Sequence, residues 1–281
     1  MKPTAIQFVL AAIAIVLIAT FTSAQNTPQQ PTPIFNGIAV VELFTSEGCS
    51  SCPPADKLLA EVIELADREN AQIFGLSFHV GYWNRLGWTD PFSSTENTQR
   101  QYWYSSSFNR ASVYTPQAIV NGQWEFVGSD SKLMAESLRA ALQTKPTGTL
   151  TIESLKLESD QKNKNHESDK NGEDKSRTIQ VTLNHKDLGD RYDDIVINIA
   201  AAERNLKVDV PRGENRGRQL SHQNVVRAFQ TITPDPAKPQ PTVTLTLPDD
   251  LKTENTSIII YAQNKESRHI INAAAAKIPA E

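Results

Sequence analysis

Cysteine is rare in this sequence. Only two cysteines occur among the 281 residues, at positions 49 and 52. A small domain stapled by disulfides needs more cysteines, spread along the chain, so the composition excludes that class of protein. Because the two that are present stand three positions apart, they mark one local site.

An excess of positive charge is also missing. The chain carries 28 Lys and Arg against 32 Asp and Glu, which gives a formal net charge of −4. Proteins that bind nucleic acid as their main partner usually present a basic surface, so we expect no nucleic acid partner here. The hydrophobic content of 39% is typical of a soluble globular protein, and the length suffices for two domains.

The N-terminus lacks an apolar run long enough to predict a membrane span. The run from Phe8 to Ala19 follows a single charge, Lys2, and precedes the small residues Thr22-Ser23-Ala24. This pattern is typical of a signal peptide, which we place at residues 1–24. We therefore expect a periplasmic or secreted protein, and a membrane attachment only if this segment stays uncleaved.

Residues 25–36 are polar and proline-rich and are predicted to form a linker. The following region, 37–148, predicts the order strand, helix, strand, helix, strand, strand, helix. The expected strands are 38–44, 72–80, 117–120 and 124–127, and the expected helices follow the cysteines, lie within 88–108 and follow Asp130. Asn121-Gly122 is a strong hairpin signal between the last two strands. This order predicts a mixed sheet covered by helices.

Residues 149–281 show little helical periodicity and predict a β-rich, β-sandwich-like C-terminal domain. The expected strands are 149–158, 178–185, 195–202, 242–247 and 257–262. Between the first two lies 160–176, which contains no apolar side chain. Such a segment buries nothing that would offset the entropy of ordering it, so we predict a disordered insertion.

The sequence Cys49-Ser50-Ser51-Cys52 lies between a predicted strand and a predicted helix. The unpaired N–H groups and positive end of a helix N-terminus favour a thiolate, which is the attacking species in thiol–disulfide exchange. Outside the cytoplasm, such a pair also persists as a disulfide. The pattern predicts a redox-active pair, with a buried structural disulfide as the alternative.

Four segments of the chain resemble an exported family of thioredoxin-like proteins catalogued as a domain of unknown function. They are VELFTSEGCSSCPPADKLL, SFHVGYWNRLGWTDPFSS, VYTPQAIVNG and PRGENRGRQLSHQNVVR. The resemblance implies an α/β thioredoxin-like fold for residues 37–148, with Cys49 as the exposed attacking sulfur and Cys52 as the resolving one. It also implies that Pro116 is a cis-proline facing the cysteines and that Thr115 offers its backbone to an extended substrate segment.

The resemblance supplies no substrate. Common thioredoxin centres carry an aromatic residue before the first cysteine and Gly-Pro between the pair, whereas this chain has Gly48 and two serines. Because the intervening residues tune the redox potential, the direction of exchange stays open.

Two further residues are candidates for the same site. Glu42, in the first strand, is a candidate to exchange a proton with Cys52, or is simply an outward-facing or capped glutamate. His79 ends the second strand, where ligands of open α/β sheets gather. It is a candidate to stabilise a thiolate or to bind a metal with it, or is a satisfied polar residue at a strand end.

Aromatic and polar side chains follow. Trp83 and Trp88 are candidates to wall a substrate groove beside the cysteines, with packing over the sheet edge as the alternative. A polar cluster in the C-terminal region comprises residues 213–218 (GENRGR) with His222, Asn224 and Arg227, and its glycine-flanked arginines could bind phosphate or carboxylate. No phosphate-loop spacing accompanies it, so we favour an internal salt-bridged loop or a domain contact over an anion site.

These observations leave three functions open. The first is an extracytoplasmic thiol–disulfide oxidoreductase that acts on exported protein thiols or disulfides without a cofactor. The second is a copper-handling module that uses Cys49, Cys52 and His79, since thiolates and imidazole suit Cu(I). The third is an interaction protein whose disulfide is structural.

Overall fold

The structure is a computed structural model that describes residues 36–159, 177–189 and 191–279. The predicted signal peptide (1–24), all of the predicted linker except Asn36, and the predicted insertion (160–176) lie outside the described residues. Within the described part of the chain, no helix is both long and apolar enough to cross a bilayer.

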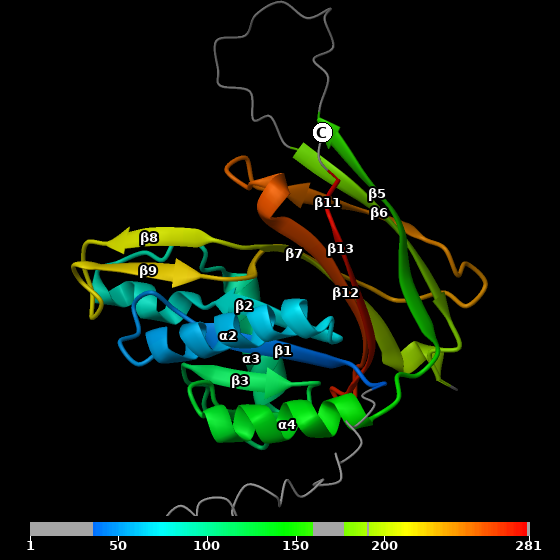
Figure 1. The fold of residues 1–281 in the computed structure, drawn as a ribbon, viewed down its shortest axis with the longest axis horizontal. Helices are drawn as coiled ribbons and strands as arrows, with labels where there is room; N and C mark the ends of the chain where they lie inside the picture. Colours follow the sequence, from blue (N-terminus) through cyan, green and yellow to red (C-terminus); the bar gives the residue numbers. More distant parts are fainter. Residues whose placement is uncertain (1–35, 160–176, 190, 280–281) are drawn as a thin grey trace, which may run out of the picture. The chain divides into compact units, whose positions relative to one another are not determined.

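An eight-stranded mixed sheet runs through the molecule in the order β13-β12-β7-β10-β2-β1-β3-β4 (Figure 1). β1 (Ala39–Thr45) pairs in parallel with β2 (Ile73–His79) and antiparallel with β3 (Gln117–Val120), which pairs with β4 (Trp124–Val127). Asn121 and Gly122 join the last two strands with φ values of 46° and 67°. This confirms the hairpin that the Asn-Gly pair predicts.

Three α-helices cover the two faces of this part of the sheet. They are α2 (Pro53–Glu69), α3 (Thr95–Ser105) and α4 (Ser131–Gln143), with a 3₁₀ helix η1 at Gly81–Leu86. Alternate residues of a strand point to opposite faces. Val41 and Leu43 of β1 therefore pack with α2 and α4, whereas Val40 and Phe44 pack with Tyr104 of α3.

The C-terminal region adds four strands to the same sheet and builds two smaller sheets. The added strands are β7 (Ile195–Glu203), β10 (Val225–Ile232), β12 (Thr256–Asn264) and β13 (Ile270–Lys277). The three-stranded sheet contains β5 (Thr149–Ser159), β6 (Arg177–Lys186) and β11 (Thr242–Leu247), and the two-stranded ribbon contains β8 (Leu206–Val210) and β9 (Arg218–His222). Short 3₁₀ helices, η2 (Tyr192–Asp194) and η3 (Thr253–Asn255), lead into β7 and β12.

The three-stranded sheet and the strands β7 and β12 share one apolar core, with Ile179 and Val181 on one side and Ile197 and Ile258 on the other. β10 then pairs in parallel with β2, where Val225 lies opposite Ser77. The division predicted between residues 148 and 149 therefore does not separate two sheets. The chain from Asn36 onward forms one compact unit.

A buried ion pair joins the two halves of this unit. Glu42 of β1 is fully buried and accepts hydrogen bonds from Arg100 Nε at 2.6 Å, from the Tyr261 hydroxyl at 2.8 Å and from the Tyr104 hydroxyl. Burial, together with the Glu42 carboxylate, raises the pKa of Tyr104 well above its ordinary value. The Arg100 guanidinium also lies over aromatic rings, which are those of Phe78, Trp103, Tyr104, Phe229 and Tyr261.

Removing the Glu42 charge should destabilise the whole unit. Glu42→Gln leaves the Arg100 cation buried without its counter-charge, and we expect the free energy of unfolding to fall by about 3 kcal/mol. Urea unfolding followed by tryptophan fluorescence measures this change. Glu61→Gln is the control, because it breaks the Lys57–Glu61 pair, whose side chains are 78% and 57% exposed, and should cost about 0.5 kcal/mol at most. Equal losses for the two variants would contradict the prediction.

Candidate functional site

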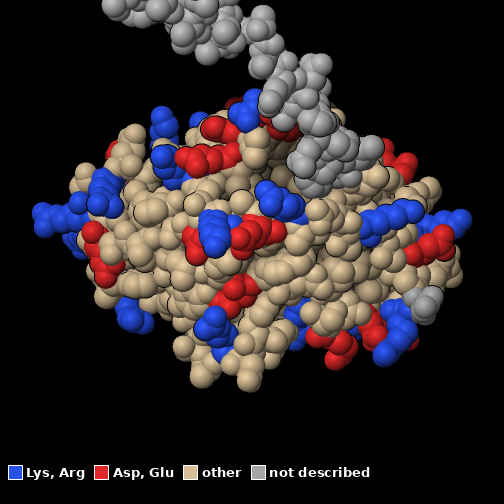
Figure 2. Space-filling view, turned by 60° about the horizontal axis from the view of Figure 1, so that its bottom comes forward, with Lys and Arg blue, Asp and Glu red and all other residues tan. Residues whose placement is uncertain are grey.

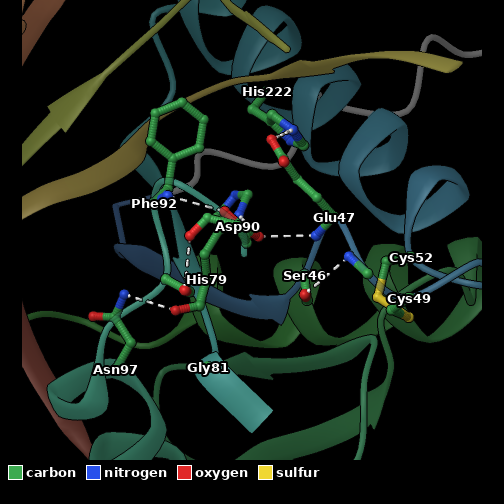
Figure 3. Close-up of polar contacts among 12 residues, drawn as sticks. Ser46, Glu47, Cys49, Cys52, His79, Gly81, Asp90, Phe92, Asn97 and His222 are labelled. Atoms are coloured by element: carbon green, nitrogen blue, oxygen red, sulfur yellow. Dashed lines mark hydrogen bonds and ion pairs between the residues drawn. A yellow bond between two sulfur atoms is a disulfide. The ribbon is translucent and has the colours of Figure 1, made fainter. Parts of the chain in front are cut away.

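The two cysteines form a disulfide at the start of α2 (Figure 3). Their Cα atoms are 5.4 Å apart. Cys52 is the N-cap residue, its carbonyl accepts from the backbone N–H groups of Ala55 and Asp56 at 2.8 and 3.1 Å, and prolines occupy the first helical positions. Pro53 and Pro54 have no N–H group and the next two N–H groups donate to Cys52, so the helix start offers the sulfurs the positive end of its dipole, which favours a thiolate.

Both cysteines are buried, which corrects the expectation that the Cys49 sulfur is exposed. The exposed fraction is 0% for Cys49 and 1% for Cys52. Loop 211–217, between β8 and β9, contacts the backbone of the cysteine loop, residues 46–52. The Asn215 side-chain amide donates to the backbone carbonyls of Glu47 and Cys49 at 2.8 and 2.9 Å, and the Glu214 carboxylate accepts from the Ser50 N–H at 2.9 Å.

The same contacts confirm that the polar cluster of the C-terminal region makes an internal contact. Hydrogen bonds from Ser50 hold the pKa of the Glu214 carboxyl below its ordinary value, so Glu214 is ionised at neutral pH. Loop 211–217 thus binds the cysteine loop through one charged and one neutral side chain.

Thr115, Pro116 and Trp83 reach the cysteine loop from the other side. The Trp83 indole donates to the Thr115 hydroxyl at 2.7 Å, and a Cβ on Gly48 would lie 3.0 Å from the Trp83 Cβ. The peptide bond before Pro116 is cis, as expected. A Cβ on Gly128 would lie 3.1 Å from the Cβ of Ala55 in α2 and 3.3 Å from that of Pro116, so Pro116 is near the first turn of α2.

A cleft of about 470 Å³ opens beside this group. Its lining includes Tyr82, Trp83, Arg85, Tyr102, Tyr114 and Thr115. Burial raises the pKa of Tyr82 to about 12, so its phenol is neutral and donates to Gln101 Oε1 at 3.1 Å. The cleft therefore offers aromatic surface and the Arg85 side chain to a ligand.

Trp88 contacts Glu47, the residue that precedes Gly48, directly, and His79 contacts it through Asp90. The Trp88 indole donates to Glu47 Oε2 at 2.6 Å. His79 Nδ1 lies 2.7 Å from Asp90 Oδ2, and the same Asp90 oxygen accepts from the Glu47 backbone N–H at 2.9 Å (Figure 3). Both predicted residues thus lie behind the cysteine loop, where they hold Glu47, and neither lines the cleft beside Thr115.

Glu42 does not belong to this site. It shares a sheet face with Val40 and Phe44, opposite α2, and its carboxylate is bound to Arg100 and two tyrosines. The expectation that Glu42 exchanges a proton with Cys52 is therefore wrong, because the alternation along β1 turns its side chain away from the helix that carries the cysteines.

His222 of β9 completes a buried polar cluster behind the cysteines. Its Nε2 lies 3.3 Å from Glu47 Oε1 and its Nδ1 lies 3.9 Å from Asp56 Oδ2, and its ring meets that of His79 edge to face at 4.7 Å. Neither His222 nitrogen has a hydrogen-bond partner among the described residues, and the same holds for Asp56 Oδ1 and His79 Nε2.

The cluster shifts three pKa values. Burial raises the pKa of Asp56, and the charges of His222 and His79 offset only part of this effect. Burial alone would lower the pKa of His79, but the Asp90 carboxylate outweighs it and raises that pKa. Burial likewise opposes ionisation of Asp90, yet the His79 charge and hydrogen bonds lower its pKa. His79 and Asp90 therefore form a buried ion pair, whereas Asp56 is held toward its neutral form.

Across the described residues, no group of three or more His, Cys, Asp and Glu side chains is arranged to hold a metal ion. In particular, His79 directs Nδ1 to Asp90, and the disulfide uses both sulfurs. The copper-handling alternative therefore gains no support from the geometry.

Several residues of the site were not predicted, namely Glu47, Asp56, Asp90, Glu214, Asn215 and His222 in these roles. One local signal was available for Asp56, which stands four positions after Cys52 and hence on the same side of a helix. Asn215 contacts Cys49 and His222 contacts Glu47, in each case across more than 160 positions of the chain. No local pattern predicts such contacts.

Solved structures that are similar to this chain include the following two. A crystal structure of a protein from Agrobacterium tumefaciens is 28% identical, with a TM-score of 0.55, and the match covers 87% of this chain and 96% of that one. The structure described as HBP35 of Porphyromonas gingivalis is 17% identical, also with a TM-score of 0.55, over 88% of this chain and 77% of that one, and shows likeness of fold alone.

A search among curated proteins finds no match. A family described as a protein of unknown function, DUF1223, matches residues 40–263, which include the whole cysteine site. The chain therefore belongs to the DUF1223 family.

Proposed function

We propose that this protein is an extracytoplasmic thiol–disulfide oxidoreductase that acts on the thiols or disulfides of exported proteins. The observation that carries the proposal is the Cys49–Cys52 disulfide at the N-terminus of α2, beside the Thr115–Pro116 segment and an aromatic cleft. The extracytoplasmic location rests on the signal-peptide pattern of the sequence.

We also propose that residues 37–148 have a thioredoxin-like fold. In support, β1 is flanked by the parallel β2 and the antiparallel β3, and the β3–β4 hairpin is followed by α4. The two helices α2 and α4 cover one face of these strands and α3 covers the other.

The chemistry is a balanced exchange of one disulfide for another. A substrate thiolate attacks Cys49 Sγ, the Cys49–Cys52 bond breaks, and its electron pair passes to Cys52 Sγ as a thiolate. A second substrate thiolate then attacks the substrate sulfur of the mixed disulfide and releases Cys49. The substrate dithiol is thereby oxidised and the protein disulfide reduced. The reverse sequence reduces a substrate disulfide.

One feature favours a protein segment as the substrate. The cleft next to Thr115 is open and aromatic, which suits an extended peptide better than a small charged thiol. On the face shown in Figure 2, Lys and Arg side chains are interspersed with Asp and Glu side chains.

The burial of both cysteines favours a second candidate, an interaction protein with a structural disulfide. Structural cysteines are buried and inert, whereas catalytic ones are accessible. The two functions differ in whether the pair reacts in the folded protein, and the following two experiments measure this.

Cys52→Ser should trap mixed disulfides, and Cys49→Ser should not. In Cys52→Ser the Cys49 thiolate still attacks a substrate disulfide, and no resolving thiol remains to release the adduct. Each variant is incubated with an oxidised, scrambled model protein, and adducts are counted on a non-reducing gel. The Cys49→Ser, Cys52→Ser double variant is the blank. Absence of adducts from Cys52→Ser would leave the structural disulfide as the function.

Opening loop 211–217 should expose the disulfide. Asn215→Ala removes two buried hydrogen bonds, each worth about 1 kcal/mol, so the disulfide in the folded protein should be reduced by dithiothreitol at least about tenfold faster. Arg216→Ala is the matched control, since this exposed residue of the same loop makes no side-chain contact to the cysteine loop among the described hydrogen bonds. The prediction fails if Asn215→Ala and Arg216→Ala are reduced at the same rate.

A further inference from the structure

Two buried carboxyl groups bracket the cysteine pair. Glu47 stands two residues before Cys49 and is fully buried, and Asp56 stands four residues after Cys52 and is 7% exposed. Four residues make about one helical turn, and helical side chains lean toward the N-terminus, so Asp56 projects toward the side of α2 that carries Cys52. Asp56 is therefore the buried carboxyl group on the side of α2 that carries Cys52.

His222 connects the two carboxyl groups. One ring nitrogen lies 3.3 Å from Glu47 and the other 3.9 Å from Asp56, and its side chain is 1% exposed. Neither nitrogen makes a hydrogen bond to another described residue. A buried polar atom without a partner needs an explanation, because its desolvation is unfavourable. The position of His222 explains its burial, because its ring lies close to both the Glu47 and the Asp56 carboxyl groups.

The other charges around the cluster are already paired. His79 is held by Asp90, and Arg227, which lies over the Phe92 ring, pairs with Glu203 and Asp250. Among the described residues, no lysine or arginine forms an ion pair with Glu47 or Asp56. Positive charge on His222 or on His79 lowers the pKa of Asp56, and the Asp90 carboxylate opposes this effect.

We propose that Asp56 exchanges a proton with Cys52 during disulfide exchange and that His222 is the positioning residue that sets when Asp56 holds that proton. The proposal deepens the oxidoreductase function proposed above and rests on it. His222 comes from β9, outside the region 37–148, so the C-terminal region would take part in the chemistry as well as in the fold.

Each direction of the exchange moves one proton between Asp56 and Cys52 as the Cys49–Cys52 bond breaks or forms. When a substrate thiolate attacks Cys49 Sγ, Cys52 leaves as a thiolate and takes the proton of the Asp56 carboxyl group. The new Asp56 carboxylate faces the His222 ring, and the proton that the substrate thiol lost goes to solvent. In the reverse direction, the Asp56 carboxylate removes the proton from the Cys52 thiol, whose thiolate then attacks the mixed disulfide at Cys49.

The pH dependence of the exchange equilibrium tests this coupling. The equilibrium constant with glutathione is measured from pH 5 to pH 9, with acid quenching, alkylation in denaturant and mass spectrometry to count reduced protein. The thiols of glutathione and of Cys49 bend the plot of log K against pH in every variant, and a carboxyl group that shares a proton with Cys52 adds a further bend. We expect this further bend in the wild type, its loss in Asp56→Asn and its partial return in Asp56→Glu.

His222→Gln should move the bend to higher pH by about one unit or more, because Asp56 loses a nearby positive charge that favours its ionised form. His222→Asn serves as a second replacement of different length. His185→Gln is the matched control, since His185 is also fully buried with both ring nitrogens unpaired among the described residues, but belongs to β6. It should leave the bend in place.

Each result decides a separate point. A wild-type bend in Asp56→Asn would overturn the role of Asp56, and an unmoved bend in both His222 variants would overturn that of His222. The equilibrium can be measured for any disulfide, so these outcomes do not depend on adduct trapping. If Cys52→Ser traps nothing while the bend responds as expected, the oxidoreductase function fails and the proton coupling stands as a property of the disulfide.

Discussion

The parallel pairing of β10 with β2 is the contact on which the candidate site depends. The Ser77 N–H donates to the Asn224 carbonyl at 2.9 Å, and the Asn224 side chain donates to the Gly75 carbonyl at 2.8 Å. Asn224 has a φ of 49°, a conformation that asparagine tolerates better than most residues. His222 lies two positions earlier. The pairing therefore fixes β9, and with it His222 and the loop that carries Asn215, against the cysteine end of α2.

Charge is distributed unevenly between the two sides of the central strands. On the α3 side, Glu42 is fully satisfied by Arg100 and two tyrosines, as expected where an ion pair serves stability. On the α2 side, by contrast, Glu47, Asp56 and His222 are buried with polar atoms left unpaired among the described residues. Unpaired buried charge is costly, and structures tolerate it chiefly where perturbed protonation has a use. This contrast is the physical reason to look for chemistry beside the cysteines and not beside Glu42.

Elements that depend on neighbouring residues are predictable from the sequence, whereas contacts between residues far apart in the chain are not. Asn121-Gly122 predicts its hairpin, and the helix predicted after Asp130 begins there, with the Asp130 side chain accepting from the N–H groups of Lys132 and Leu133. In contrast, β1 is buried on both faces, so its pattern does not tell which way Glu42 points. The strands β8, β9, β10 and β13 were not predicted. β9 is polar and β13 is rich in alanine, so both are weak in β-propensity, whereas β10 carries the β-branched and aromatic residues that are typical of a strand. Because β9 and β10 were not predicted, the contact of loop 211–217 with the cysteine loop was not predicted either.

The buried disulfide can react as proposed only if loop 211–217 moves away from the cysteine loop. Loop 211–217 is hydrogen-bonded to the carbonyls of Glu47 and Cys49 and to the N–H of Ser50. If this loop moves away, the backbone around Cys49 therefore loses these hydrogen bonds. Three hydrogen bonds of about 1 kcal/mol each hold the open state to a small fraction of molecules and reduce the rate of attack by that fraction. A partner that binds the open form raises this fraction. Selectivity would then come from displacement of loop 211–217, because thiols that cannot displace it meet a buried sulfur.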